Sequence, residues 1–67
     1  MDIRERLSQE IKNSGLSNTE IAKQLGVSQS IISKYRNMQK RPTLDTFAKL
    51  CKILDVSADY ILGLSDF

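Results

Sequence analysis

Polar side chains that can donate and accept hydrogen bonds recur over residues 29–37 at the spacing of one helix face. At about 100° of rotation per residue, they share the side opposite an apolar cluster. The members of this polar face are Gln29, Ser30, Ser33, Lys34 and Asn37. An amide offers both donor and acceptor groups, a hydroxyl can serve in either role, and an ammonium group donates. This combination suits the recognition of a hydrogen-bonding surface by a helix.

The other side of the same segment is apolar. Ile31, Ile32 and Tyr35 cluster there, and Ser28 is suited to cap the first turn. The spacing therefore predicts a helix over residues 29–37 with a buried apolar side and an outward-facing polar side.

A second amphipathic segment comes directly before this one and must position it. Ser17 and Glu20 have the spacing of a capping box, and Gly26 suits the left-handed residue that ends a helix. These signals predict a helix over residues 18–25, whose small Ala22 lets the following helix cross closely. The apolar positions of the helix and its turn are Ile21, Leu25 and Val27, with Tyr35 beyond them. Two short helices joined by a sharp turn, the second presenting a polar face to a groove, are typical of a helix-turn-helix DNA reader.

Helical periodicity continues through the rest of the chain, and strand signals are poor. Asp2 can cap a helix over residues 2–14, and Leu16 lies at the position of a hydrophobic staple. Residues 38–42 read as a loop, because Pro42 disfavours helix in the residue before it. Thr43 and Ser57 can cap helices over residues 44–54 and 58–62. The expected fold is all-α, a single domain of residues 1–67 built as a compact five-helix bundle.

Several apolar residues near the end of the chain have no obvious cover. On the helix of residues 44–54 the predicted buried stripe has Leu50 at its edge and comprises Leu44, Phe47, Ala48, Cys51 and Leu54. Ile53 lies nearly opposite and needs cover from the last helix or from a partner subunit. Leu64 and Phe67 either fold back on the core or belong to a dimer contact or a junction with a further domain. The candidate dimer contacts are Ile53, Tyr60, Leu64 and Phe67.

The charge is unevenly distributed along the chain, although the net charge is only +2. Residues 1–33 sum to zero, residues 34–52 to +5 and residues 53–67 to −3. A basic segment that begins on the outward-facing helix would attract a phosphate backbone. A solvated basic surface explains the same numbers, and charge alone does not decide between the two readings.

Composition excludes most enzyme classes. The chain has no histidine, one cysteine, and no phosphate-binding loop, nucleophile–base arrangement or metal-ligand cluster, so no cofactor is expected. Cys51 falls on an apolar stripe and is interpreted as a buried, inert thiol. No signal peptide or apolar run of membrane-spanning length is present, which predicts a cytoplasmic protein that does not associate with a membrane.

The chain resembles the lambda-repressor/Cro-like (XRE) family of helix-turn-helix domains from about Ile3 to Leu64. The resemblance is carried by three segments in order, which are residues 16–30 (LSNTEIAKQLGVSQS), 42–47 (PTLDTF) and 55–63 (DVSADYILG). It implies a five-helix domain, usually a homodimer on a two-fold-related double-stranded DNA operator, that represses or activates transcription. It also implies a bacterial or phage-encoded protein.

The same resemblance assigns roles to individual residues. Gln29 and Ser30 match positions that read base edges, Lys34 could reach a guanine or the backbone, and Ser33 points the same way. Ile31 could touch a thymine methyl group or extend the core. The implied contacts to the DNA backbone are Asn18, Arg36, Asn37, Lys40 and Arg41.

A protein-interaction module is the alternative function. An example would be an antitoxin whose helices mask a toxin, with DNA binding secondary or lost. The uncovered Leu64 and Phe67 keep this alternative open.

Overall fold

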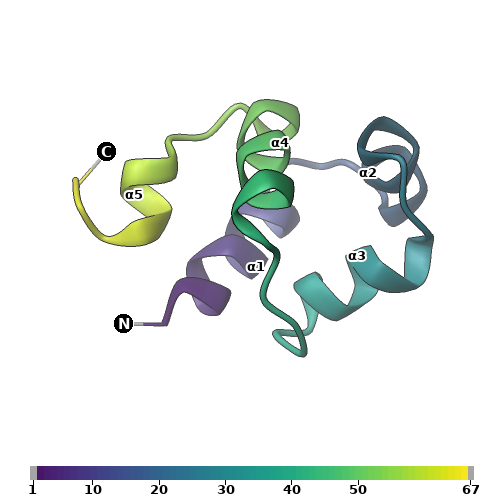
Figure 1. Ribbon diagram of the computed structural model, residues 1–67, viewed down its shortest axis with the longest axis horizontal. Helices are drawn as coiled ribbons and strands as arrows, with labels where there is room; N and C mark the ends of the chain where they lie inside the picture. Colours follow the sequence, from purple (N-terminus) through teal and green to yellow (C-terminus); the bar gives the residue numbers. More distant parts are fainter. Residues whose placement is uncertain (1, 67) are drawn as a thin grey trace.

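Five α-helices and no strand make up residues 2–66, the part of the chain that the computed structural model describes (Figure 1). The helices are α1 (Ile3–Asn13), α2 (Asn18–Leu25), α3 (Gln29–Arg36), α4 (Leu44–Leu54) and α5 (Ala58–Leu62). The predicted fold class and helix order are therefore confirmed. Three ends differ by one residue from the prediction, because Asp2, Ser14 and Asn37 flank α1 and α3 as caps.

Side-chain caps explain where most of the helices begin. The side-chain oxygens of four capping residues accept hydrogen bonds from the first turn of their helix, as predicted for Asp2, Ser17, Thr43 and Ser57. Each cap satisfies one of the backbone N–H groups that a helix start leaves without a partner. Ser28 has the extended backbone of a cap, but its side chain makes no such bond, so the start of α3 lacks this contact.

The turn between α2 and α3 depends on a left-handed glycine. Gly26 has φ of 80°, a conformation that costs an L-residue energy because of its Cβ. The carbonyl of Ala22 accepts hydrogen bonds from the N–H groups of Gly26 and Val27, at 2.8 and 3.1 Å. Ala22 is only 4% exposed, so this small residue of α2 lies in the core, and α2 packs against α3.

The core lies where the five helices meet. Helix α1 packs against α3 and α5, and α2 packs against α3 and α4, so α5 and the α2–α3 pair lie at opposite ends of the molecule (Figure 1). The largest fully buried side chains are Leu7, Ile11, Ile21, Ile32, Leu50 and Ile61. Every helix contributes at least one of them, and α3 is oriented by its packing against α1 and α2.

The predicted buried stripe of α4 is wrong at two positions. Leu44 is 82% exposed and Ala48 is also exposed, whereas Leu50 is completely buried. The buried set is Phe47, Leu50, Cys51 and Leu54, which has the i, i+3, i+4, i+7 spacing of a helix face. The buried face of α4 is therefore shifted toward Leu50 relative to the face that the apolar pattern predicts.

The other apolar residues that were expected to need cover differ in how exposed they are. Ile53 and Tyr60 are half-buried and pack against the core of their own chain, while Leu64 is 75% exposed and does not fold back. Val27 was expected at an apolar position of the turn, but it is 37% exposed because the chain turns to the surface after Gly26. The prediction for Phe67 lies outside the described residues.

The loop after α3 begins with a left-handed residue that is not glycine. Met38 has φ of 60°, and the N–H groups of Met38 and Gln39 donate to the carbonyls of Tyr35 and Lys34. This hydrogen-bond pattern is the Schellman motif, in which glycine usually occupies the left-handed position.

We therefore expect Met38→Gly to raise the free energy of unfolding. Left-handed backbone costs an L-residue roughly 1–2 kcal/mol, and the greater freedom of glycine in the unfolded chain returns roughly 0.5–1 kcal/mol of that gain. The expected net stabilisation is about 0.5–1 kcal/mol, measured by urea unfolding. Gln39→Gly is the control, because Gln39 does not have positive φ and should lose stability. A less stable Met38→Gly variant would show that the loop is held in another way.

Candidate nucleic-acid interface

The polar side of α3 faces solvent, as the sequence predicts. Gln29, Ser30 and Lys34 are exposed and Ser33 is half-buried. On the opposite side Ile32 is completely buried and Tyr35 is 4% exposed. With its side chains an α-helix is about 10–12 Å in diameter, which fits the DNA major groove of about 12 Å width. The exposed groups are an amide, a hydroxyl and an ammonium, which can bond to base edges.

Helix α3 is held against α1 by a buried hydroxyl as well as by apolar packing. Ser8 is 4% exposed and is the buried polar residue of the described part of the chain. Its hydroxyl donates to the backbone carbonyl of Arg36, one of the last carbonyls of α3. Ile31 is half-buried and packs against the core, which favours the core contact predicted as one of its two roles.

The first residue of α2 and the last residue of α3 are joined by their side chains. Arg36 Nε donates to Asn18 Oδ1 at 2.9 Å, and Arg36 Nη2 donates to the backbone carbonyl of Leu16 at 3.3 Å. Both side chains were expected to contact the DNA backbone. The structure shows that two of the donor nitrogens of Arg36 have acceptors within the protein.

The other expected backbone contacts lie around the α3–α4 connection. Asn37, Lys40 and Arg41 are exposed. The Nδ2 group of Asn37 lies 3.4 Å from the Ser33 hydroxyl, and Arg41 lies 3.8 Å from a carboxylate oxygen of Asp2. The side chain of Arg41 is 64% exposed, so this distant ion pair leaves its guanidinium accessible.

A basic residue that the sequence interpretation missed also reaches this connection. Arg4 Nη1 donates to the carbonyl of Met38 at 3.4 Å, and Arg4 Nη2 pairs with Asp2 at 2.9 Å. The hydrogen bond from the Arg4 side chain lowers the pKa of Asp2 to about 2, with further contributions from the Arg4 backbone N–H and the charges of Arg4 and Arg41. Nothing in the local spacing signals this contact, because 34 positions separate Arg4 and Met38.

Carboxylates are absent from the whole helix-turn-helix segment after its first turn. Between Glu20 and Asp45 the sequence has no acidic residue and five basic ones, which are Lys23, Lys34, Arg36, Lys40 and Arg41. A segment whose charged side chains are all basic attracts polyanions and raises the rate of encounter with them. The charge pattern and the exposed polar side of α3 therefore belong to the same segment.

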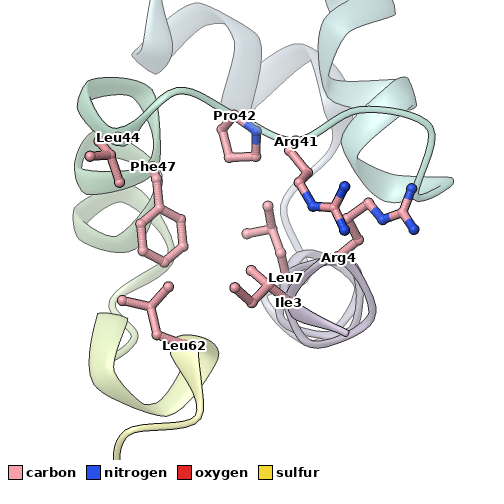
Figure 2. A pocket seen from close by; sticks show the side chains of 8 residues that line it. All are labelled: Ile3, Arg4, Leu7, Arg41, Pro42, Leu44, Phe47 and Leu62. Atoms are coloured by element: carbon pink, nitrogen blue, oxygen red, sulfur yellow. The ribbon is translucent and has the colours of Figure 1, made fainter. Parts of the chain in front are cut away.

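An apolar pocket of about 120 Å³ lies elsewhere, between α1, the α3–α4 connection, α4 and α5. Figure 2 shows Ile3 and Leu7 facing Phe47 and Leu62, while the guanidinium groups of Arg4 and Arg41 point away from these apolar walls. Its lining residues include no carboxylate, hydroxyl or thiol. The pocket therefore lacks the paired titratable groups that acid–base or nucleophilic catalysis needs.

The lone thiol is also unsuited to chemistry. Cys51 is 8% exposed, and burial raises its pKa, which keeps the thiol protonated near neutral pH. The interpretation of Cys51 as a buried residue is confirmed. Within residues 2–66 we find neither a cluster of three or more potential metal ligands nor a helix with the length and hydropathy to cross a membrane.

Comparison with known proteins places this arrangement in a family. A family model described as "Helix-turn-helix" matches residues 7–61. The chain is 39% identical over 62 residues to the uncharacterized HTH-type transcriptional regulator YobD of Bacillus subtilis (strain 168), covering 92% of this chain and 55% of that protein. It is 32% identical over 63 residues to the HTH-type transcriptional regulator ImmR of the same organism, covering 94% and 50%.

A phage protein is among the other relatives. The cryptic phage CTXphi transcriptional repressor RstR of Vibrio cholerae serotype O1 (strain ATCC 39315 / El Tor Inaba N16961) is 29% identical over 63 residues, covering 94% of this chain and 56% of that protein. The chain spans about half the length of the curated relatives it matches. No solved structure matches it significantly. With the geometry of α2 and α3 and a family model covering most of the sequence, the chain belongs to the XRE-type helix-turn-helix family.

Proposed function

We propose that this chain is a sequence-specific double-stranded DNA-binding domain of a transcriptional regulator, with repression as its action, and that α3 enters the major groove. The observation that carries the proposal is the outward polar side of α3, held by the buried Ile32 and Tyr35 behind it. Gln29 can make paired hydrogen bonds to adenine, and Lys34 can donate to guanine. Three relatives are named as transcriptional regulators or a repressor, which supports the same function.

Contacts to the DNA backbone would flank this helix. Asn18 lies at the start of α2, and Asn37, Lys40 and Arg41 follow α3. Such contacts fix the register of the protein on the duplex but carry no sequence information. The absence of carboxylates between Glu20 and Asp45 supports a phosphate-facing surface here.

We further propose that the protein acts as a homodimer. One helix of eight residues reads only a few base pairs, and a two-fold pair would read two half-sites about one helical turn apart. Leu64 is the strongest candidate contact among the described residues because it is 75% exposed, whereas Ile53 and Tyr60 are half-buried in their own chain.

The exposed leucines also favour a second candidate function. Leu44 and Leu64 are 82% and 75% exposed, which a protein partner could cover. The chain would then be an interaction module, such as an antitoxin, with DNA binding as a secondary property. A pull-down that yields a stoichiometric protein partner, while the chain retards no DNA, would favour this second candidate.

Selection from a random pool of duplex oligonucleotides tests the main proposal. The expected result is enrichment of a short sequence with two-fold symmetry, and light scattering of the complex should give two chains per duplex. Recovery of no preferred sequence after repeated rounds would contradict sequence-specific binding. Enrichment of a single unsymmetrical site bound by one chain would contradict the dimer alone.

Arg41→Ala should weaken binding to all duplex sequences by a similar factor. Loss of one phosphate contact is expected to raise Kd about tenfold and to reduce the slope of log K against log salt by about 0.9. Salt titrations by fluorescence anisotropy would measure both quantities. Lys52→Ala removes the same charge from the last turn of α4, at the end of that helix away from the α3–α4 connection (Figure 1). Equal salt slopes for the two variants would show that Arg41 contacts no phosphate.

A further inference from the structure

The Arg36 side chain is fixed at two points on the segment that opens α2. Its Nε group donates to Asn18 Oδ1 at 2.9 Å, and its Nη2 group donates to the Leu16 carbonyl at 3.3 Å. Arg36 and Asn18 are both half-buried. The Arg36 carbonyl is in turn bonded by the buried hydroxyl of Ser8. Arg36 is therefore tied to α1 through its backbone and to the start of α2 through its guanidinium.

This contact determines which end of the Asn18 amide is available to a ligand. A carboxamide has an acceptor oxygen and a donor NH₂ group. Because the guanidinium only donates, it bonds the oxygen and leaves the NH₂ group free. Rotating the amide by 180° would place two donors against each other, so Arg36 selects one of the two orientations.

The free end of the amide is not fully buried and has the polarity that a phosphate requires. Within residues 2–66 no side-chain nitrogen or oxygen is both buried and without a hydrogen-bond partner, and the Nδ2 group of Asn18 has no partner. This group is therefore not sealed inside the protein and keeps some contact with solvent. Phosphate oxygens only accept hydrogen bonds, so an Asn18 that presents its NH₂ group can bond a phosphate.

We propose that Arg36 is a positioning residue that fixes the Asn18 amide with its NH₂ group toward a DNA phosphate. Arg36 acts through Asn18 and does not contact that phosphate itself. The inference rests on the proposed DNA-binding function. It couples the start of α2 to the end of α3, so the phosphate contact and the reading helix move as one unit.

A double-mutant cycle on the selected duplex distinguishes positioning from direct contact. Asn18→Ala and Arg36→Met should each raise Kd about five- to tenfold. Methionine keeps an unbranched, helix-forming side chain while removing the donors. If Arg36 acts through Asn18, the double variant should be no weaker than the weaker single variant. Single-variant effects that multiply would overturn the proposal.

Replacing single phosphates by an uncharged group identifies the phosphate that Asn18 contacts. Each backbone phosphate of the duplex is replaced in turn by an uncharged methylphosphonate, and binding is measured for every protein. At one position per half-site, the wild-type protein should lose affinity while Asn18→Ala and Arg36→Met do not. Lys40→Met, a charge-matched control in the α3–α4 connection, should remain sensitive at that position. Retained sensitivity of Arg36→Met at the position where Asn18→Ala is insensitive would overturn the proposal.

Asn18→Asp provides a test in which the contact to Arg36 is kept. Aspartate still offers oxygen acceptors to the guanidinium but lacks the NH₂ donor and adds a negative charge. We expect its Kd to rise more than tenfold while its thermal unfolding midpoint does not fall. Wild-type affinity in this variant would overturn the proposal. Failure of the wild-type protein to bind any duplex would overturn the DNA-binding function as well, which separates the two outcomes.

Discussion

Replacement of Gln29 by alanine is expected to abolish the base preference at one position of each DNA half-site. Gln29 is the first residue of α3, and its amide is exposed on the polar side of the helix. A paired hydrogen bond from an amide to a base edge contributes about 1–3 kcal/mol of discrimination, or about five- to 150-fold in relative affinity. The variant should bind the preferred sequence more weakly and substituted sequences nearly as well as before.

A panel of duplexes, each with one base pair changed, measures this effect in competition with the selected sequence. Gln24→Ala is the matched control, because it removes an exposed amide from α2 rather than from the polar side of α3. The control should retain the full pattern of preferences. A Gln29→Ala variant that retained the same pattern would contradict the assignment of Gln29 to base recognition.

Local rules account for the helices that the sequence predicts correctly. Ser17 and Gly26 bound α2 because each satisfies a requirement of a helix end, a hydrogen-bond acceptor at the start and a left-handed residue at the finish. Both requirements involve residues within four positions of each other. They can therefore be read without knowledge of the tertiary structure.

The choice of the buried face of α4 depends on tertiary packing, and the sequence pattern does not predict it. Leu44, Leu50 and Ile53 are all apolar and occupy different sides of this helix, so periodicity alone admits more than one buried face. Packing against α2 and the rest of the core selects the face with Leu50, which is completely buried. Leu44, in the first turn of α4, is left 82% exposed.

The candidate interface also has features that local sequence pattern predicts and contacts that it does not. The exposure of Gln29 and Lys34 follows from the buried Ile32 on the other side of one short helix, so local pattern predicts it. The bond between Arg36 and Asn18 joins residues 18 positions apart, and the contact from Arg4 to the α3–α4 connection spans 34. Such contacts depend on how helices cross, which the pattern of a single helix does not contain.

Ile32→Ala is expected to cause the largest loss of stability of the changes considered. Ile32 is completely buried behind the polar side of α3, and truncation of such a side chain costs about 2–5 kcal/mol through lost burial and the cavity left behind. The free energy of unfolding of native proteins is roughly 0.05–0.15 kcal/mol per residue. For a domain of 67 residues, a loss of this size is a large part of the total. Alanine is a better helix former than isoleucine, so the loss would come from packing and not from helix propensity.

Urea unfolding followed by circular dichroism would measure the change, with DNA binding recorded in the same buffer. Leu44→Ala is the control, since it removes as many side-chain carbons from a residue that is 82% exposed and should alter the stability by less than about 0.5 kcal/mol. The apparent affinity for DNA should fall with the folded fraction of Ile32→Ala, and saturating duplex should raise that fraction, because a ligand of the folded state stabilises it. An Ile32→Ala variant as stable as the control would mean that α3 is not held by its apolar side, and the presentation of Gln29 and Lys34 would then need a different physical basis.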